Sequence, residues 1–322
     1  MLNPRLRTRG ESLPADVSDF GQAVLEGFSK PRKTLPCRFF YDARGSALFE
    51  QITELPEYYP TRTEAAILNA NAGQIAQDVP VGGILVEFGS GLSLKTEILL
   101  RKLEHLRAYV SIDVSETALR DASERLRRNL PRLDVRPIVG DFSHPIALPG
   151  DLAGAHKTGF FPGSTIGNLT PNEAERLLQV FRTSLAPRGR LIVGVDLKKD
   201  PRRLVLAYDD AAGVTAAFNL NLLARINREL GGNIDLASFR HEAIYNPREG
   251  RIEMHLESTR DQDAKVLGQL FRFRSGERIH TENSYKYSVR QFQQLAASAG
   301  WSPRRVWTDA ESLFSVHELV LA

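Results

Sequence analysis

The stretch VEFGSGLSLKT, Val86 to Thr96, continues a short apolar run that begins at Ile84. A run of this length and composition predicts a strand buried on both faces of a parallel sheet. Gly89 and Gly91 permit a tight turn and a close approach of the backbone to a ligand, as in the strand-to-helix turns that bind nucleotides. With Ser90 between them, they form the first candidate cofactor-binding segment.

Two more candidates follow the next predicted strands. Asp113 closes the strand at 108–113, and its carboxylate could accept hydrogen bonds from both hydroxyls of a ribose. Asp141 and Phe142 follow the strand at 134–139 and could hold the amino group and the face of an adenine. Each feature alone has a common structural explanation. Three of them after three successive strands indicate a binding edge, because open α/β sheets bind ligands at the carboxyl ends of their strands.

These candidates favour S-adenosylmethionine over a dinucleotide. The dinucleotide fingerprint G-x-G-x-x-G requires a third glycine, and Leu94 stands at that position. Glu87, two residues before Gly89, is also more typical of methyltransferases. NAD stays open as the alternative cofactor.

Strands and helices alternate between residues 80 and 196. The helix after the fourth strand has the clearest start, because Thr170 is an N-cap candidate, Pro171 fits the first helical position and Glu173 completes a capping box. Ser115 can cap an earlier helix in the same way. The alternation predicts a right-handed, doubly wound α/β sheet. Its predicted strands are 84–88, 108–113, 134–139, 159–162 and 190–195.

The pattern changes after Val195. Apolar residues from Val214 to Leu230 are spaced as one face of a helix that ends at Gly231. Strands are predicted at 251–259, 266–274, 304–308 and 313–321, and a helix at 288–299. We therefore predict two domains. Residues 60–196 with 287–322 form the cofactor-binding domain, and residues 1–59 with 197–286 form an inserted α+β substrate-binding domain.

Composition restricts the class of protein. The chain has 322 residues, of which 42% are hydrophobic and 25% charged, as in ordinary globular proteins. Its 42 basic and 39 acidic residues are interspersed, which does not favour a nucleic-acid partner. Cys37 is the only cysteine, which excludes an intrachain disulfide and is typical of a reducing compartment. With no apolar run of membrane-spanning length, we expect a cytoplasmic monomer that binds no metal, no membrane and no nucleic acid.

Four long stretches together resemble the histidine N-α-methyltransferases of ergothioneine biosynthesis, and the similarity runs from about residue 20 to the C-terminus. They are CRFFYDARGSALFEQITELPEYYPTRTE (37–64), VEFGSGLSLKT (86–96), FFPGSTIGNLTP (160–171) and RLVLAYDDAAGVTAAFN (203–219). The resemblance implies a Rossmann-like class I methyltransferase fold with a second, inserted domain. It also implies three successive methylations of L-histidine, through its mono- and dimethylated forms, to hercynine, each using one S-adenosylmethionine.

The resemblance assigns roles to individual residues. The cofactor positions are Gly89, Ser90, Gly91, Lys95, Asp113, Asp141 and Phe142, and the substrate positions are Phe49, Tyr58, Gly163, Asn168, Tyr208, Met254, Glu282 and Ser284. Asn168 and Tyr208 would hold the amino-acid head group, and Glu282 and Ser284 the imidazole. Asn168 and Tyr41 are the implied catalytic residues. A strong base is not expected, since the sulfonium donor is already activated and water or a tyrosine could relay the proton.

The residues themselves are compatible with these roles. Glu282 and Ser284 lie two apart, so in an extended segment their side chains point the same way. An ionised carboxylate accepts from an imidazole N–H, and a hydroxyl can donate or accept. Met254, by contrast, alternates with Ile252 and Leu256, a pattern that without the family predicts core packing. Two alternatives stay open: N-methylation of another amino acid or amine on the same scaffold, and a non-catalytic protein that binds a small molecule.

Overall fold

The structure is a computed structural model that describes residues 17–91 and 94–322. The chain divides into two compact units. The larger unit comprises 53–208, 245–252 and 283–322, and the smaller comprises the described residues up to Ile52, then 209–244 and 253–282. The predicted assignment of one domain to the cofactor and the other to the substrate stays a prediction.

The helices of the described chain are α1 (Asp19–Ser29), α2 (Ala43–Glu54), α3 (Tyr59–Gln77), α4 (Leu94–Leu100), α5 (Glu116–Asn129), α6 (Pro171–Leu185), α7 (Pro201–Leu206), α8 (Val214–Leu230) and α9 (Val289–Ser298). Short 3-10 turns are η1 (Cys37–Phe40), η2 (Gly150–Leu152), η3 (Thr165–Asn168) and η4 (Leu236–Ser238). The strands are β1 (Lys33–Thr34), β2 (Ile84–Phe88), β3 (Ala108–Asp113), β4 (Val135–Val139), β5 (Lys157–Phe161), β6 (Arg190–Asp196), β7 (Phe239–Asn246), β8 (Arg251–Ser258), β9 (Gln262–Val266), β10 (Gln269–Phe273), β11 (Arg278–Tyr285), β12 (Trp301–Thr308) and β13 (Phe314–Leu321).

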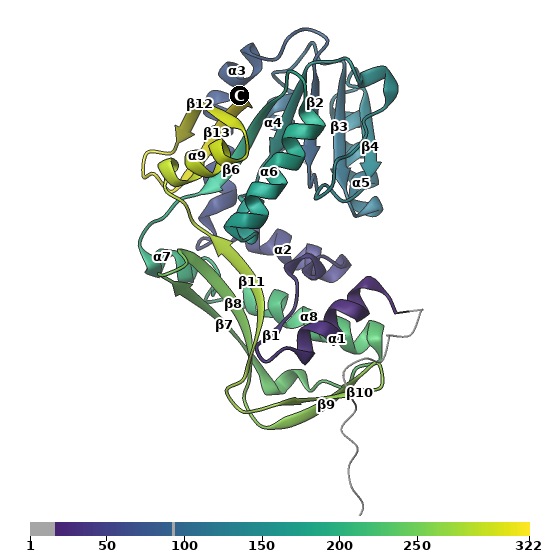
Figure 1. The fold of residues 1–322 in the computed structure, drawn as a ribbon, viewed down its shortest axis with the longest axis vertical. Coiled ribbons are helices and arrows are strands. Elements are labelled where there is room, and N and C mark those ends of the chain that lie inside the picture. Colours follow the sequence, from purple (N-terminus) through teal and green to yellow (C-terminus); the bar gives the residue numbers. More distant parts are fainter. Residues whose placement is uncertain (1–16, 92–93) are drawn as a thin grey trace, which may run out of the picture. The chain divides into compact units, whose positions relative to one another are not determined.

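The larger unit contains a seven-stranded sheet in the order β12-β13-β6-β5-β2-β3-β4 (Figure 1). Strands β2 to β6 are parallel, whereas β13 runs antiparallel to both β6 and β12. The chain moves outward from β2 to β4, then returns to place β5 on the other side of β2. Ligands bind at such a reversal, at the carboxyl ends of the strands. The predicted doubly wound sheet is confirmed.

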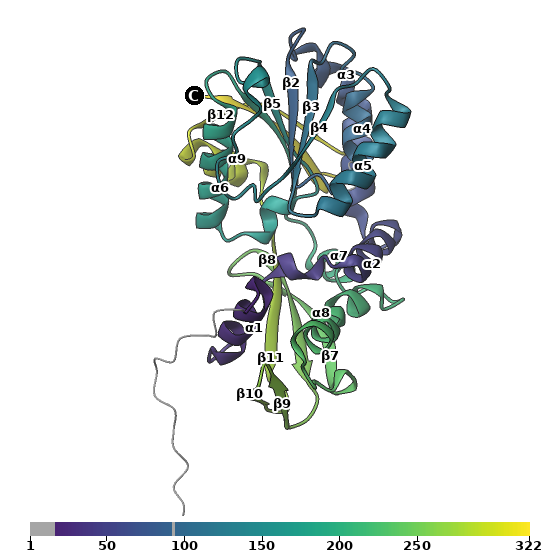
Figure 2. The same ribbon diagram turned by 90° about the vertical axis from the view of Figure 1, so that its right-hand side faces the viewer.

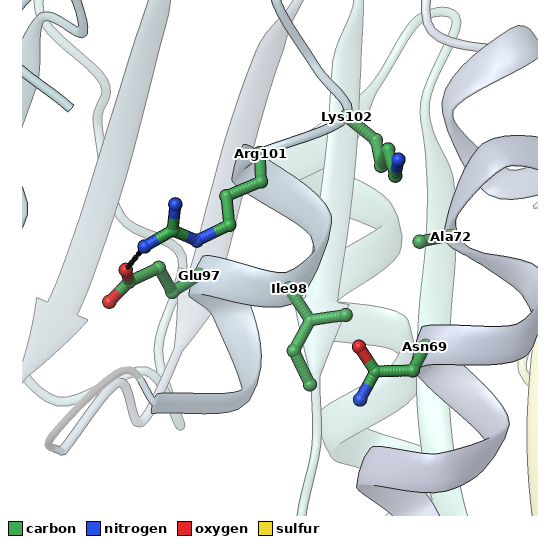
Figure 3. Close-up of a pocket in the computed structure, with 6 residues that line it drawn as sticks. All are labelled: Asn69, Ala72, Glu97, Ile98, Arg101 and Lys102. Carbon is green, nitrogen blue, oxygen red and sulfur yellow. Dashed lines mark hydrogen bonds and ion pairs between the residues drawn. The ribbon is translucent and has the colours of Figure 1, made fainter. Parts of the chain in front are cut away.

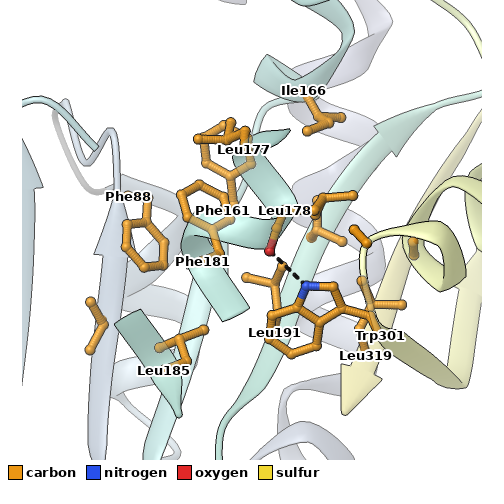
Figure 4. Close-up of a cluster of buried hydrophobic side chains, with 14 of the residues drawn as sticks. Phe88, Phe161, Ile166, Leu177, Leu178, Phe181, Leu185, Leu191, Trp301 and Leu319 are labelled. Carbon is orange, nitrogen blue, oxygen red and sulfur yellow. Dashed lines mark hydrogen bonds between the residues drawn. The ribbon is translucent and has the colours of Figure 1, made fainter. Parts of the chain in front are cut away.

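Helices cover both faces of this sheet, with α6 and α9 on one face and α3, α4 and α5 on the other (Figure 2). Neighbouring side chains of β2 point to opposite faces of the sheet. Val86 packs in the core under α6 and α9, and Leu85 packs in the core under α3 to α5. In the first core, the rings of Phe88 and Phe181 stack with centroids 4.0 Å apart (Figure 4). Two buried faces explain why the strand sequences are continuously apolar.

Local sequence signals set the helix ends. The capping box of α6 is complete, because the Thr170 hydroxyl accepts from the Glu173 N–H and the Glu173 carboxylate accepts from the Thr170 N–H. The Ser115 hydroxyl accepts from Ala118 N–H at the start of α5. Gly231 ends α8 in the left-handed conformation, with φ of 60°. These predicted boundaries are confirmed.

The second sheet has four strands in the order β1-β11-β8-β7, and β9 and β10 form a separate hairpin. The hairpin corrects the expectation of one strand at 266–274. Val266 pairs with Gln269, and the chain reverses at Leu267 and Gly268, whose φ angles are 49° and 78°. A two-residue turn with both φ angles positive matches the twist of a hairpin, and the glycine adopts this conformation without steric cost.

Two features are absent from the described residues. None of their helices combines the length and apolar character needed to cross a membrane. None of their His, Cys, Asp and Glu side chains gather in groups of three or more that could hold a metal ion. The expectation that no metal takes part stays a prediction.

Candidate active site

The carboxyl ends of five parallel strands bring the predicted cofactor residues to one edge of the sheet. The segments at this edge are Gly89–Gly91 after β2, Asp113 at the end of β3, Asp141 and Phe142 after β4, Gly163–Asn168 after β5, and Asp196 at the end of β6. Because all five lie in the larger unit, the fold of that unit alone gathers them.

Asp113 joins the loops after β2, β3 and β4. Its two carboxylate oxygens accept from the N–H groups of Gly91 and Ser115, each at 2.9 Å. Its backbone carbonyl accepts from Gly140 N–H, also at 2.9 Å. A carboxylate has about four acceptor positions, so two remain for the hydroxyls of a ribose. The predicted use of Asp113 therefore fits its surroundings.

Phe142 lies against the glycine turn. A Cβ added to Gly89, whose φ is 69°, would come within 3.0 Å of Phe142 Cε1. The Phe142 ring also meets Phe161 edge to face, with centroids 5.6 Å apart. Asp141 accepts from Ser143 N–H at 2.8 Å through one of its oxygens. A flat ring beside a bare backbone turn and a carboxylate together suit an adenosyl group.

Glu87 has a structural role in the described fold. The carboxylate is 1% exposed and accepts from the hydroxyls of Thr96, at 2.5 Å, and Tyr109. These bonds connect β2 to β3 and to α4. Glu87, which favoured a methyltransferase over a dinucleotide enzyme in the sequence, thus connects the strand that leads into the glycine turn to its neighbours.

Glu64, a residue of α3 that was not predicted, connects Lys95 to Gly163. Its fully buried carboxylate lies 2.5 Å from Lys95 Nζ and accepts from Gly163 N–H at 2.8 and 3.0 Å. Lys95 was predicted to bind the cofactor and Gly163 the substrate. Their shared partner fixes both at the same edge. The burial of Glu64 has no local signal in the sequence, since an acid in a polar helix is usually solvated.

Asn168 ends η3, directly before Leu169 and the N-cap of α6. Within the described residues its side-chain amide makes no hydrogen bond. An amide offers one acceptor oxygen and a donor nitrogen. Asn168 can therefore bind an amine and a carboxylate together, as expected from the sequence.

Tyr208 and Ser284 are closer than their predicted roles suggested. Their hydroxyl oxygens are 2.7 Å apart, and both side chains are buried. The Tyr58 ring, also predicted to contact substrate, meets the Tyr208 ring at a centroid distance of 6.1 Å and an angle of 68°. The residues predicted for the head group and for the imidazole thus share a hydrogen bond.

The four remaining predicted site residues, one catalytic and three substrate-binding, belong to the smaller unit. Tyr41 meets Phe49 edge to face at 5.6 Å, and both rings lie within 6.0 Å of the Phe218 ring. Met254 is 1% exposed in β8, as its alternation with apolar neighbours predicted. Glu282 lies in β11, in an extended segment with Ser284.

A buried ionic cluster behind Tyr208 was missed. Asp196 lies 2.5 Å from Lys199 and 2.6 Å from Lys286, and accepts from the Tyr59 hydroxyl at 2.8 Å. Burial opposes ionisation of Asp196, yet the two ammonium groups hold its pKa below the ordinary value. Asp196 closes β6 just as Asp113 closes β3, and that parallel was the signal available in the sequence.

A surface hollow between α3 and α4 is separate from these residues (Figure 3). Its lining consists of Asn69, Ala72, Glu97, Ile98, Arg101 and Lys102. Glu97 and Arg101, one turn apart, form an ion pair at 2.5 Å. None of these six residues was predicted to bind cofactor or substrate.

The sequence profile of the family described as "Histidine-specific methyltransferase, SAM-dependent" matches residues 20–321. The chain belongs to this family. It is 42% identical to the histidine N-alpha-methyltransferase of Mycolicibacterium smegmatis, over 91% of this chain and 92% of that protein. It is 32% identical to ergothioneine biosynthesis protein 1 of Neurospora crassa, over 91% of this chain and 35% of that protein.

The fold of this histidine-specific methyltransferase is shared with a solved structure. That structure, an S-adenosylmethionine-dependent methyltransferase from Clostridium acetobutylicum, superposes with a TM-score of 0.50 at 11% identity, covering 85% of this chain and 98% of that chain. S-adenosylmethionine is the methyl donor of the family. The predicted family, donor and Rossmann-like fold are therefore confirmed.

Proposed function

We propose that this methyltransferase transfers three methyl groups in succession from S-adenosylmethionine to the α-amino nitrogen of L-histidine. The product is hercynine, the trimethylated precursor in ergothioneine biosynthesis. The names of the two relatives support the substrate and the pathway. The structural observation that carries the proposal is the Asn168 amide, which makes no hydrogen bond within the described chain. It lies at the same edge of the sheet as the segments proposed to bind S-adenosylmethionine.

For the donor, we propose that Asp113 accepts from the ribose hydroxyls and that Asp141 and Phe142 hold the adenine. The turn from Gly89 to Gly91 offers bare backbone beside them. Ser90 and Lys95 complete the set of residues that we propose to bind S-adenosylmethionine. When bound, S-adenosylmethionine supplies a methyl group on a positively charged sulfur.

For the substrate, we propose that Asn168 and Tyr208 bind the head group and that Glu282 and Ser284 bind the imidazole. Asn168 then directs the lone pair of the amine, and Tyr41 is the second proposed catalytic residue. The walls of the pocket would come from Phe49, Tyr58, Gly163 and Met254.

Methyl transfer needs alignment more than covalent help from the protein. The amine lone pair must face the methyl group along the carbon–sulfur bond. In each round a nitrogen–carbon bond forms, the carbon–sulfur bond breaks, and S-adenosylhomocysteine leaves uncharged. The amine must be neutral to react, and the neighbouring sulfonium disfavours its protonated form. A proton leaves the nitrogen before each transfer, and the third transfer yields a permanent cation.

Incubation of the protein with L-histidine and excess S-adenosylmethionine tests the proposal by mass spectrometry. We expect a product three methyl groups heavier, with all three on the α-nitrogen in tandem spectra. A methyl group on the ring would refute the proposed orientation. Methylation of another amine, with histidine unchanged, would establish the alternative substrate class. Donor binding by calorimetry without any transfer to histidine or another amine would indicate a binding protein.

The remaining expectations concern the state of the protein in the cell. Cys37, the only cysteine in the sequence, supports a reducing compartment, and we propose the cytoplasm. A monomer without nucleic-acid or membrane partners also stays a prediction. Light scattering of the purified protein measures the oligomeric state, and fractionation of cells locates the protein.

A further inference from the structure

Lys286 uses all of its hydrogen-bond donors within the larger unit. Its ammonium group, which is fully buried, lies 2.6 Å from Asp196 Oδ2, 2.9 Å from Tyr208 Oη and 2.8 Å from Ser284 Oγ. An ammonium group has three N–H donors. Each is therefore directed at one of these three oxygens, and the position of the nitrogen is fixed.

This arrangement determines the direction of the bond between the two hydroxyls. Both oxygens accept from Lys286, so one further hydrogen lies on the 2.7 Å line between Tyr208 and Ser284. A phenol is the stronger acid and the better donor, so Tyr208 donates to Ser284. The two lone pairs of Ser284 Oγ are then filled, by Lys286 and by Tyr208. The hydrogen bond that Ser284 can still make is through its own O–H, which donates.

The charge of Lys286 also bears on the ligand. Its buried ammonium group lies 2.8 Å from Ser284 Oγ, whereas Lys199 pairs with Asp196 on the other side. A buried cation disfavours a second cation nearby. Lys286 therefore favours a neutral ring beside Ser284 over a protonated one.

We propose that Lys286 is a positioning residue that makes Ser284 a hydrogen-bond donor to an unprotonated ring nitrogen of the bound amino acid. This inference rests on the proposed function, because it takes histidine as the substrate. It assigns Ser284 the ring nitrogen that carries a lone pair and leaves the ring N–H to Glu282. The two polar groups of a neutral imidazole are then both matched.

Lys199 provides a matched control. Both lysines pair with Asp196, but Lys199 contacts Tyr59 and neither Tyr208 nor Ser284 in the described contacts. We expect Lys286→Met to raise the KM for histidine about 10- to 100-fold. Lys199→Met should change it by less than about threefold. Affinity for S-adenosylmethionine, measured by calorimetry, should stay within about twofold in both. Equal effects of the two substitutions on KM would mean that Lys286 is only structural, and would overturn the inference.

A double-mutant cycle with Ser284→Ala isolates the orientation of the hydroxyl. In the Lys286→Met background, Ser284→Ala should raise KM little further, because the hydroxyl is no longer oriented. In the Lys199→Met background it should have its full effect. Additivity in both backgrounds would overturn the inference. If Lys286→Met does not fold, Lys286→Gln replaces it in the same cycle.

Failure of the proposed function has a different signature. A wild-type protein that does not methylate histidine refutes the substrate assignment. A wild-type protein that methylates histidine, with Lys286 and Lys199 variants indistinguishable, refutes only the role of Lys286.

Discussion

Gly194 lies beneath the carboxylate of Glu64, such that a Cβ at position 194 would fall 1.9 Å from Glu64 Oε1. The missing side chain in β6 leaves the space in which a helix residue can bury its charge. From there Glu64 accepts the Gly163 N–H and pairs with Lys95. The geometry of the two proposed binding residues therefore depends on a glycine in a neighbouring strand.

We expect Gly194→Ala to lower the free energy of unfolding by about 1 to 3 kcal/mol, the usual cost of overpacking. Urea denaturation measures it. Gly73→Ala is the matched control, because Gly73 lies in α3 and an added Cβ there meets no atom within 4 Å. That change should stabilise the helix by about 0.5 to 1 kcal/mol. A Gly194→Ala protein as stable as the wild type would show that Glu64 can move at no cost.

Asp113→Ala should weaken S-adenosylmethionine binding by about 1.5 to 3 kcal/mol, the value of hydrogen bonds to a charged group. Calorimetric titration measures the change. Asp134→Ala is the control, because Asp134 lies before β4, at the opposite end of the sheet, and pairs with Arg136. It should bind the donor like the wild type. Unchanged affinity in Asp113→Ala would remove the ribose assignment.

Glu282→Ala should raise the KM for histidine about ten- to a hundredfold with little change in donor affinity, since a charge-assisted bond to the ring is lost. Adding Met254→Val should enlarge the pocket and favour a bulkier ring such as that of tryptophan. Steady-state kinetics with both amino acids measure these effects. Glu311→Ala, which removes an exposed carboxylate paired with Arg203, is the control. Intact histidine kinetics in Glu282→Ala would place the imidazole elsewhere.

His317 should make the protein less stable in acid. Ser315 Oγ donates to Val195 O, so His317 Nε2–H donates to Ser315, at 2.9 Å. Nδ1 is buried with no partner among the described residues, and burial lowers the His317 pKa to about 3. The unfolded chain therefore binds more protons between pH 6.5 and 3, and stability falls as the pH falls through that window.

The contribution of His317 has a slope of at most about 1.4 kcal/mol per pH unit. Urea denaturation at pH 7, 6 and 5 compares the wild type with His317→Leu, which cannot take up the proton. The variant should show the weaker pH dependence. Parallel curves would mean that His317 is not responsible.

The parts of the fold that could be predicted from the sequence are those whose causes are local. The bounds of β2 and β3, and the caps at Thr170 and Ser115, match the structure because apolar runs and capping residues act on their own neighbours. Helix α3, with Tyr58 at its N-cap position and Pro60 in its first turn, was not predicted. Strands β7 and β11 were not predicted.

The missed site residues share one property, which is that their partners are distant in the sequence. The buried position of Glu64 depends on Gly163 and Gly194. The buried position of Lys286 depends on Asp196 and Tyr208. In a linear sequence each is an ordinary charged residue of a polar segment. Only the folded chain shows which charges are removed from water together, and this is why the Lys286 cluster could not be proposed from spacing alone.

Strand β13, which is translated last, is needed to complete the pairing of β6. It pairs with β6 from Phe314 opposite Asp196 to Val320 opposite Arg190. A ribosome must therefore make everything between Asp196 and Phe314 before β6 can be covered on that side. Until then the growing chain carries an unpaired edge that contains Leu191, Val193 and Val195, the kind of edge that recruits other strands. Chaperone demand during translation should therefore persist until the final strand emerges.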